Sequence, residues 1–339
     1  MVKIYTEQSF LKENNRKRIF PLLFDMAYQP NNNNAISNFI LTDSLSQADV
    51  AIFPLDVVSF LKNDKSNFFH NWIAKMSQNK IPIWIYTAGD FGFTFKNENV
   101  LTFRMGGFNS KLPINTCILP SFVNDPYNKI LKNDFFVLPK KESPTIGFVG
   151  NANGSFSKFL KEFILYLKRG IINLRYGYPE DHHPFYPASK KRYKLLYKIQ
   201  KDKRIQSDFI FRDKYRARNE NKEKTTFEFF KNIQDNLYTF CLRGNGNFSV
   251  RFYEVLIMGR IPVLINTDVR LPLEDLIDWN KHCVIVSEDS IIQDLLNFHS
   301  SKTELELEEI QTNNRKLVLE RLNRVDYFVQ ISNKYLESK

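Results

Sequence analysis

The chain has few cysteines and no long apolar run, and each shortage excludes a class of protein. Its three cysteines are Cys117, Cys241 and Cys283. Their odd number and wide spacing exclude a disulfide framework and a CxxC zinc site, and they favour a reducing compartment. Seven charged side chains interrupt the first twenty residues, which excludes a signal peptide there, and no later run has the length of a membrane span. We therefore expect a soluble cytoplasmic protein.

Acidic side chains are outnumbered, with 37 Asp and Glu against 48 Lys and Arg, which gives a net charge of +11. Such a chain attracts anions, whether nucleic acid, an anionic membrane surface or acidic small molecules such as nucleotide sugars. Much of the excess lies in Ser189 to Arg204, where apolar residues recur at roughly helical spacing among lysines. This segment is a solvated helix face or a binding patch. In the second case, Lys190 to Arg204 contacts anionic headgroups and holds the protein peripherally at the inner membrane face.

A large apolar and aromatic content excludes a disordered chain. Hydrophobic residues make up 43% of the sequence, with 31 Phe and 15 Tyr. So much apolar surface must be buried, and 339 residues suffice for two domains of ordinary size.

Short apolar runs alternate with helical stretches along the whole chain, which predicts an α/β fold with parallel sheets covered on both faces. In the first half, Val57 to Asn79 has the apolar pattern of a crossover helix between two such strands. The strands expected in this half are Lys3 to Tyr5, Asp49 to Phe53, Ile81 to Tyr86, Val100 to Phe103 and Thr116 to Leu119.

A second alternating series follows the charged, proline-containing segment Leu138 to Pro144, which we interpret as a linker. It begins with a strand at Thr145 to Val149 and a helix at Phe156 to Lys168. We therefore expect an N-terminal domain over residues 1–140, a second domain over 141–320 and a C-terminal helix over 321–339. The sequence leaves open which domain the last helices cover.

The segment Tyr238 to Trp279 carries the clearest chemistry. A buried strand runs into a loop bearing Arg243, Gly244, Asn245 and Gly246, and Ser249 then stands where it can cap a helix. Unpaired N–H groups and the dipole at such a helix start favour an anion.

Charged side chains on this helix extend the candidate site. Arg243 and Arg251 can add charge-assisted hydrogen bonds to phosphate oxygens. Glu254, three residues beyond Arg251 on a neighbouring part of the same helix face, can accept hydrogen bonds from ribose hydroxyls. The helix stops at Gly259, and the next strand returns the chain to the edge of the sheet where ligands bind in α/β folds.

The ordered motifs of this segment resemble the exostosin family of glycosyltransferases. The resemblance lies in S-x-R-x-x-E, then G-x-I-P-V, D-x-x-L-P and an acidic D-W, in that order over some forty residues. The matching residues are Ser249, Arg251 and Glu254; Gly259, Ile261, Pro262 and Val263; Asp268, Leu271 and Pro272; and Asp278 with Trp279.

This resemblance implies a GT-B enzyme, in which two Rossmann-like domains face each other across a cleft and the second holds a nucleotide-sugar donor. It further implies an inverting transfer, in which Arg251, the helix start at Ser249 and Arg243 stabilise the departing diphosphate. A uridine diphosphate sugar is the donor we expect. No D-x-D sequence occurs in the chain, so we expect catalysis without a metal or other cofactor.

Outside this segment, candidate site residues follow other predicted strands. Asp90 lies in the glycine-flanked turn TAGDFG after a first-domain strand, and it is either the general base or the side chain of an Asx turn. Gly150 and Asn151 end the first strand of the second domain and are candidate donor contacts. Arg212 reaches the donor phosphates or, alternatively, forms a surface salt bridge.

His182 and His183 stand side by side next to two acidic residues, yet adjacent histidines with no third well-spaced ligand do not make a metal site. We therefore assign them to an ordinary loop.

These observations predict a transferase that adds one sugar to a glycan or lipid-linked acceptor in surface polysaccharide or glycan synthesis. Two alternatives remain at this point. A nucleic-acid-binding protein would use the basic surface, although no recognised motif accompanies it and we expect no nucleic acid partner. A sugar-nucleotide-binding pseudoenzyme would keep Arg251 and Glu254 without turnover.

Overall fold

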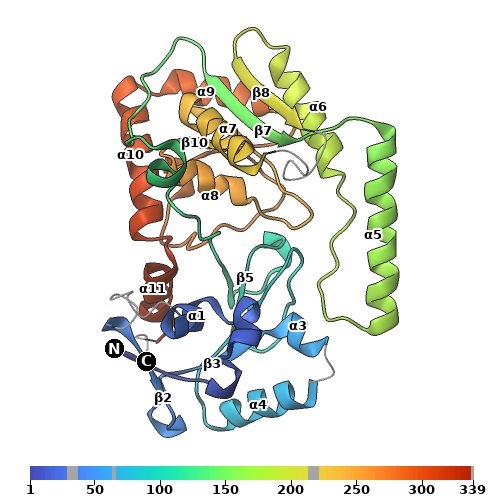
Figure 1. Ribbon diagram of the computed structural model, residues 1–339, viewed down its shortest axis with the longest axis vertical. Helices are drawn as coiled ribbons and strands as arrows, with labels where there is room; N and C mark the ends of the chain where they lie inside the picture. Colours follow the sequence, from blue (N-terminus) through green and yellow to red (C-terminus); the bar gives the residue numbers. More distant parts are fainter. Residues whose placement is uncertain (29–36, 63–65, 213–220, 337–339) are drawn as a thin grey trace.

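A computed structural model describes residues 1–28, 37–62, 66–212 and 221–336. It contains two separate parallel sheets, which lie one above the other in Figure 1. The predicted α/β class with two Rossmann-like domains is thereby confirmed, and the two facing domains have the GT-B arrangement.

The first sheet has six strands in the order β2-β1-β3-β4-β5-β6. Its central strand is buried throughout because its apolar residues meet helices on both faces. The strands are β1 (Val2–Tyr5), β2 (Phe39–Thr42), β3 (Val50–Asp56), β4 (Ile83–Thr87), β5 (Val100–Arg104) and β6 (Thr116–Ile118). The helices are α1 (Pro21–Tyr28), α3 (Val57–Leu61) and α4 (Ser66–Gln78), the last two replacing the single crossover helix predicted.

The second sheet has five strands in the order β11-β10-β9-β7-β8. These are β7 (Thr145–Asn151), β8 (Gln206–Arg212), β9 (Tyr238–Cys241), β10 (Ile261–Ile265) and β11 (Val284–Val286). The chain leaves β7 for β8 on one side and then crosses back to β9 on the other. The carboxyl ends of β7 and β9 therefore form a topological switch point, where α/β sheets bind ligands.

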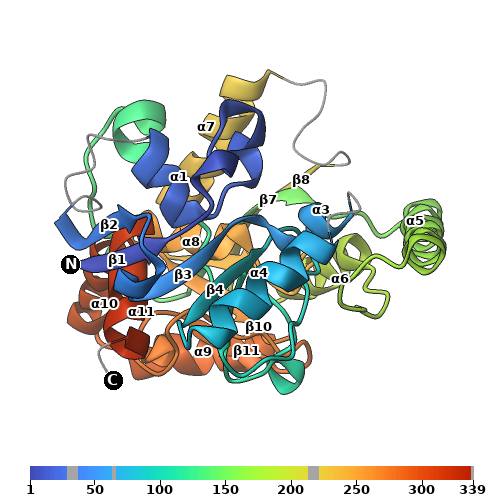
Figure 2. The same cartoon turned by 90° about the horizontal axis from the view of Figure 1, so that it is seen from below.

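Helices of the second domain are α5 (Phe156–Tyr176), α6 (Ala188–Gln200), α7 (Lys222–Asp235), α8 (Val250–Ile257), α9 (Ile291–Ser301) and α10 (Glu304–Glu320). The apolar side of α6 is buried, with Leu195, Leu196 and Ile199 in the core. In contrast, all residues of α5 are described and none is buried. Figures 1 and 2 both place α5 at the edge of the molecule beside α6.

The last two helices belong to different domains. Whereas α10 lies against α8, the following helix α11 (Arg324–Leu336) crosses back to the first domain. There the Tyr327 hydroxyl donates to the carbonyl oxygen of Ile118 at 2.8 Å, and the Phe328 ring lies 5.3 Å from that of Phe20. One apolar core consequently runs from the first sheet through α11 and α10 to α8, and it joins the two domains.

The segment Leu138 to Pro144, predicted as a linker, runs between β6 and β7 without a helix or strand. The predicted domain limits stay predictions, although each sheet lies within one of the predicted ranges. Over the described residues, no helix combines the length and the apolar character needed to cross a bilayer.

Candidate functional site

Arg243 follows β9 directly and is only 4% exposed. Its Nη2 donates to the carbonyl oxygen of Asn245 at 2.6 Å, while its buried Nε donates to no described residue. The guanidinium lies over the rings of Tyr186 and Phe108, with centroids at 4.7 and 5.1 Å. Burial lowers the pKa of Arg243, and nearby Tyr186 and Asp90 partly offset that effect. A cation held this way gains from a bound anion, because desolvation strengthens the attraction.

Arg251, in the first turn of α8, reaches across to the end of β7. Its Nη2 donates to the carbonyl oxygen of Val149 at 2.6 Å, and its guanidinium lies 4.2 Å over the Phe148 ring. Gly150 makes this approach possible, since a Cβ there would lie 2.8 Å from Arg251 Nη2. The buried Nε of Arg251, like that of Arg243, donates to no described acceptor. The structure thus brings two predicted site residues, Gly150 and Arg251, together at the switch point. The role of Gly150 there is to leave room for the Arg251 side chain.

Glu254 lies one turn beyond Arg251 on α8 and is half-buried. Burial lowers the pKa of Arg251, and the charge of Glu254 works in the opposite direction. The two side chains are therefore close enough to interact electrostatically.

Ser249 occupies the position before α8, as predicted, but its side chain makes no capping hydrogen bond. The predicted side-chain cap is therefore wrong. The first N–H groups of α8 keep no partner from this hydroxyl, which leaves the helix start suited to an anion.

The glycines of the β9–α8 loop differ in what surrounds them. A Cβ on Gly244 would meet nothing within 4 Å, whereas one on Gly246 would lie 2.4 Å from the carbonyl oxygen of Asp90. A Cβ on Gly106 would likewise lie 2.6 Å from the carbonyl oxygen of Asn247. Backbones of the two domains consequently touch at this loop, and glycine is required on both sides.

Asn247 is fully buried and was not singled out from the sequence. Its Nδ2 donates to the carbonyl oxygens of Gly107, Thr267 and Asp268 at 2.9–3.0 Å. It therefore fixes the β9–α8 loop, residues 242–249, to the first domain and to the turn after β10. Because the donor is expected to bind along it, this loop is called the donor-side loop below. An asparagine two residues before a predicted helix cap gives no signal of such long-range bonds.

Asp90 lies in the turn after β4, between Gly89 at φ 87° and Gly92 at φ 63°. Its carboxylate accepts no hydrogen bond from the described residues. Since its backbone touches Gly246 and its charge acts on Arg243, the turn does face the second domain. Its role as general base stays a prediction.

Two predicted donor contacts have other partners. The Asn151 side chain accepts from the Ser189 hydroxyl at 2.8 Å and donates to the Arg212 carbonyl at 3.2 Å, so it holds α6 and β8 together. Arg212 itself forms an ion pair with Glu228 on α7 at 2.8 Å. The salt bridge weighed as its alternative is what the structure contains, and we remove both side chains from the donor site.

His183 lies in a loop, as predicted, and it is buried there. The side chain is 4% exposed and lies between the rings of Phe91 and Phe108, at 4.9 and 4.8 Å. Its buried Nδ1 has no described partner. Burial, together with the charges of Arg243 and Arg104, lowers the pKa of His183 to about 4. The imidazole is neutral at physiological pH and lies beside the donor-side loop.

The loop that carries His183 is fastened to the first domain by its acidic residues. Asp181 accepts from Arg104 Nη1 at 2.6 Å and from the Thr94 hydroxyl at 2.7 Å. Glu180 pairs with Lys62 at 2.6 Å and with Arg169 of α5. These pairs hold the pKa values of both carboxyls below their usual range against the effect of burial. The acidic pair Glu180 and Asp181 is the sequence signal for this fastening. Next to two histidines, however, the pair draws attention to metal binding instead.

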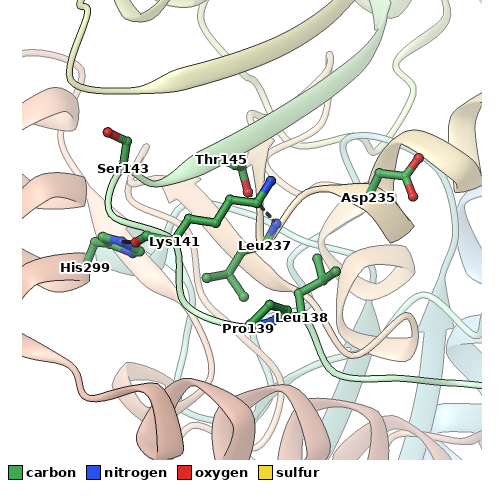
Figure 3. A pocket seen from close by; sticks show the side chains of 8 residues that line it. All are labelled: Leu138, Pro139, Lys141, Ser143, Thr145, Asp235, Leu237 and His299. Carbon is green, nitrogen blue, oxygen red and sulfur yellow. Dashed lines mark hydrogen bonds between the residues drawn. The ribbon is translucent and has the colours of Figure 1, made fainter.

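Cavities lie elsewhere in the described structure. Figure 3 shows a small one of about 20 Å³ between the linker and α9, lined by Leu138, Lys141, Asp235 and His299 among others. A hollow of about 470 Å³ lies where α10 meets α11. Neither includes a residue of the switch point. The region of the switch point that carries Arg243 and Arg251 and faces the turn of Asp90 is called the crevice below. No group of three metal-ligating side chains occurs in the described part of the chain, and metal independence stays a prediction.

Comparison with known proteins singles out the same region. Residues 186–301 match the model of the exostosin GT47 domain. Among curated proteins, the chain is 34% identical over 65 residues to one named probable glucuronosyltransferase GUT1 from Oryza sativa subsp. japonica, covering 19% of this chain and 16% of that protein. It is 32% identical over 129 residues to the exostosin-1 homolog of Caenorhabditis elegans, covering 37% and 33%. The chain thus spans a third or less of these relatives.

Solved structures are more distant. A glycosyltransferase from Rickettsia africae is 10% identical with a TM-score of 0.39, over 100% of this chain and 99% of that one. The structure of TarM is 10% identical with a TM-score of 0.36, over 85% and 54%. The fold assignment therefore depends on the two sheets themselves.

Proposed function

We propose that this chain, an exostosin-family glycosyltransferase by residues 186–301, transfers one sugar from a nucleotide diphosphate to an acceptor hydroxyl. One observation carries the proposal. Arg243 and Arg251, both with an unpaired buried Nε, converge on the carboxyl ends of β9 and β7 within or beside the matched region. Two desolvated cations at a switch point and a helix start suit a diphosphate.

In this proposal the donor lies along the loop from Arg243 to Ser249. Arg251 and the α8 N–H groups bind the diphosphate, and Arg243 contacts it or the sugar from the side of the first domain. Glu254 accepts hydrogen bonds from the ribose hydroxyls. Uridine diphosphate is the leaving group we propose, since the expected donor is a uridine diphosphate sugar.

Transfer proceeds by a single displacement with inversion. The acceptor hydroxyl oxygen bonds to the anomeric carbon as its proton passes to Asp90, and the bond from that carbon to the phosphate oxygen breaks. The electron pair leaves with the diphosphate, whose growing charge Arg251 and Arg243 stabilise. Asp90 suits the base because its carboxylate has no described hydrogen-bond donor and its turn contacts the donor-side loop. We propose that no metal takes part.

The acceptor class is a glycan or a lipid-linked saccharide, and the setting is assembly of a surface polysaccharide or glycan on the cytoplasmic side of a membrane. Loops of the first domain, including Gly106 to Phe108, lie opposite the donor-side loop and suit the acceptor position.

Turnover tests the proposal directly. The protein is incubated with uridine diphosphate sugars, with and without a chelator, and release of the free diphosphate is followed with mixed glycan and lipid-linked acceptors. Wild type and Arg212→Ala should both turn over, and chelation should not matter. Asp90→Asn should bind the donor yet lose transfer by about 10²–10⁴-fold, the usual contribution of a general base.

Two results would count against parts of the account. Donor binding without release of the diphosphate under every acceptor condition would favour a sugar-nucleotide-binding pseudoenzyme. Full activity of Asp90→Asn would remove that residue from the mechanism while leaving the donor site in place.

A further inference from the structure

Helix α5 exposes an apolar surface that the fold does not use. Leu174 is 87% exposed, Phe156 70% and Ile171 66%, values expected of charged side chains. The exposed apolar residues that share one side of the helix are Phe156, Leu160, Ile164, Leu167, Ile171 and Leu174. Their spacing of three and four residues places them in one stripe along the helix.

A basic stripe runs beside the apolar one. Lys161, Lys168 and Arg175 recur every seven residues, which puts them on one line down the helix, and all three are exposed. Glu162 is the one acidic residue between positions 156 and 176. It is half-buried on the inner side and lies 3.8 Å from Lys158. The outward side of α5 therefore has apolar and positive character alone.

The inner side of α5 accounts for how the helix is held. Phe159, Phe163 and Tyr166 contact the Phe185 ring at 5.2–5.5 Å, and Arg169 pairs with Glu180. These contacts hold the helix by its inner side. The apolar stripe is on a different side, so its exposure does not result from displacement of the helix.

Charge decides what covers the outward side. A second copy would bring one basic stripe against another in an antiparallel pair, with no acidic residue on either surface to meet it. An anionic lipid surface meets both stripes at once, because acyl chains accept the apolar residues and headgroups accept the lysines and arginine. A helix of 21 residues is about 30 Å long, which suits binding along a membrane surface.

We propose that α5 is a membrane-surface helix that binds anionic lipid, with its apolar stripe in the headgroup and acyl boundary. It replaces α6 as the membrane contact, since Leu195, Leu196 and Ile199 of α6 are in the core and Lys191 is paired with Glu288. Beyond α5 the chain enters the loop that carries Glu180 and His183 to the domain interface. If the proposed transfer is correct, a lipid-seated α5 holds the crevice close to a lipid-linked acceptor; lipid binding itself does not depend on that function.

Vesicle sedimentation tests this with the full chain. One set of vesicles is pure phosphatidylcholine, and the other contains about 30% phosphatidylglycerol. Two triple variants remove each stripe separately: Leu167→Gln, Ile171→Gln and Leu174→Gln; and Lys161→Gln, Lys168→Gln and Arg175→Gln. Matched controls change exposed residues elsewhere: Ile114→Gln, Leu305→Gln and Leu319→Gln; and Lys12→Gln, Lys17→Gln and Lys96→Gln.

Wild type and both controls should bind the anionic vesicles and bind pure phosphatidylcholine far more weakly. The apolar variant should lose at least about ten-fold in partitioning. The basic variant should lose about 100-fold on anionic vesicles and little on neutral ones, from three charges near the surface. Circular dichroism and uridine diphosphate binding of each variant should match wild type, which separates a failure here from a failure of the proposed function.

Three outcomes would overturn the proposal. The first is equal sedimentation of wild type with both vesicle types. The second is loss of binding in the basic variant but not in the apolar one, which would indicate a soluble polyanion. The third is a concentration-dependent dimer of wild type that the apolar variant dissolves, since α5 would then be covered by a second copy.

Discussion

The second sheet has two halves that are built alike and surrounded differently. In the half containing β9, α8 and β10, the strands are buried and five of the eight residues of α8 are buried. In the half containing β7, α5 and β8, the first five residues of β7 are also buried, but the helix after it buries none of its residues and four of the seven residues of β8 are exposed. The first half turns its charged residues inward to a crevice, and the second turns apolar residues outward.

From that difference we infer that one sheet serves two kinds of partner. The matched family region, residues 186–301, takes in the inward-facing half and begins after α5. The inward-facing half carries Arg243 and Arg251, which we propose as the cations that bind the diphosphate. The outward-facing half carries the exposed apolar stripe of α5, for which we propose a membrane surface as the partner. The predictions below change one half at a time.

Within the second sheet, the largest effect is expected at Arg251. Arg251→Ala removes a buried cation placed where charge develops on the leaving diphosphate, so kcat should fall by about 10²–10³-fold. Arg212→Ala is the matched control, because this arginine ends β8 and pairs with Glu228 outside the crevice. Steady-state release of the diphosphate measures both. Equal losses in the two variants would erase the proposed difference between the halves.

A pH effect on stability is expected from His183. Its pKa is lowered to about 4 in the folded chain and is about 6.5 when unfolded, so the unfolded state takes up a proton first as pH falls. Its stabilising contribution is complete above about pH 6.5 and is lost as pH falls towards 4, by up to about 3 kcal/mol.

His183→Gln should therefore flatten this part of the pH profile in denaturant unfolding. His282 and His299, whose pKa values burial also lowers, remain in both proteins and cancel in the difference. Parallel profiles for wild type and variant would show that His183 is not buried as a neutral group at the interface.

Gly246 should be more sensitive than Gly244 in the same loop. A Cβ at Gly246 would strike the carbonyl oxygen of Asp90, so Gly246→Ala must push the turn of the first domain away from the donor-side loop. Transfer should fall by about 10–100-fold, as expected when a catalytic group is displaced by about 1 Å. Gly244→Ala should be close to wild type, because nothing lies within 4 Å of the added atom. Similar kinetics of the two variants would contradict the close approach of the domains.

The smallest effect is expected on α5. Leu174→Ala should change the free energy of unfolding by no more than about 0.5 kcal/mol, because the side chain is already in solvent. The same change at Leu256 in α8, which is fully buried, should cost about 2–5 kcal/mol. Chemical denaturation of both variants without lipid makes the comparison, and a large loss at Leu174 would mean that the outward side is part of the core.

The sequence was sufficient for features that are local. Continuous apolar runs such as that of β3 predict buried parallel strands, and the ordered motifs around Arg251 and Glu254 lie in the region that matches the exostosin GT47 domain. Asp90 could also be placed near the crevice, since carboxyl ends of parallel strands share one edge of a sheet.

Features that depend on two distant segments could not be predicted. His183 is buried because Asp181 meets Arg104, a pairing across 77 positions, and Asn247 bonds to Gly107 across 140 positions. The sequence leaves two roles open for Arg212, and what decides between them is its ion pair with Glu228, which comes from the separate helix α7. Periodicity predicts that α5 has an apolar side but not which way that side points.

Calorimetric titration with uridine diphosphate, in the presence of a chelator, tests the central claim most directly. The account predicts that one molecule binds per chain of wild type and of Arg212→Ala, and that Arg251→Ala loses this binding while keeping its circular dichroism spectrum. Absence of binding to wild type by this and the other nucleoside diphosphates, or unchanged binding to Arg251→Ala, would contradict the assignment of the donor site to the crevice between β7 and β9.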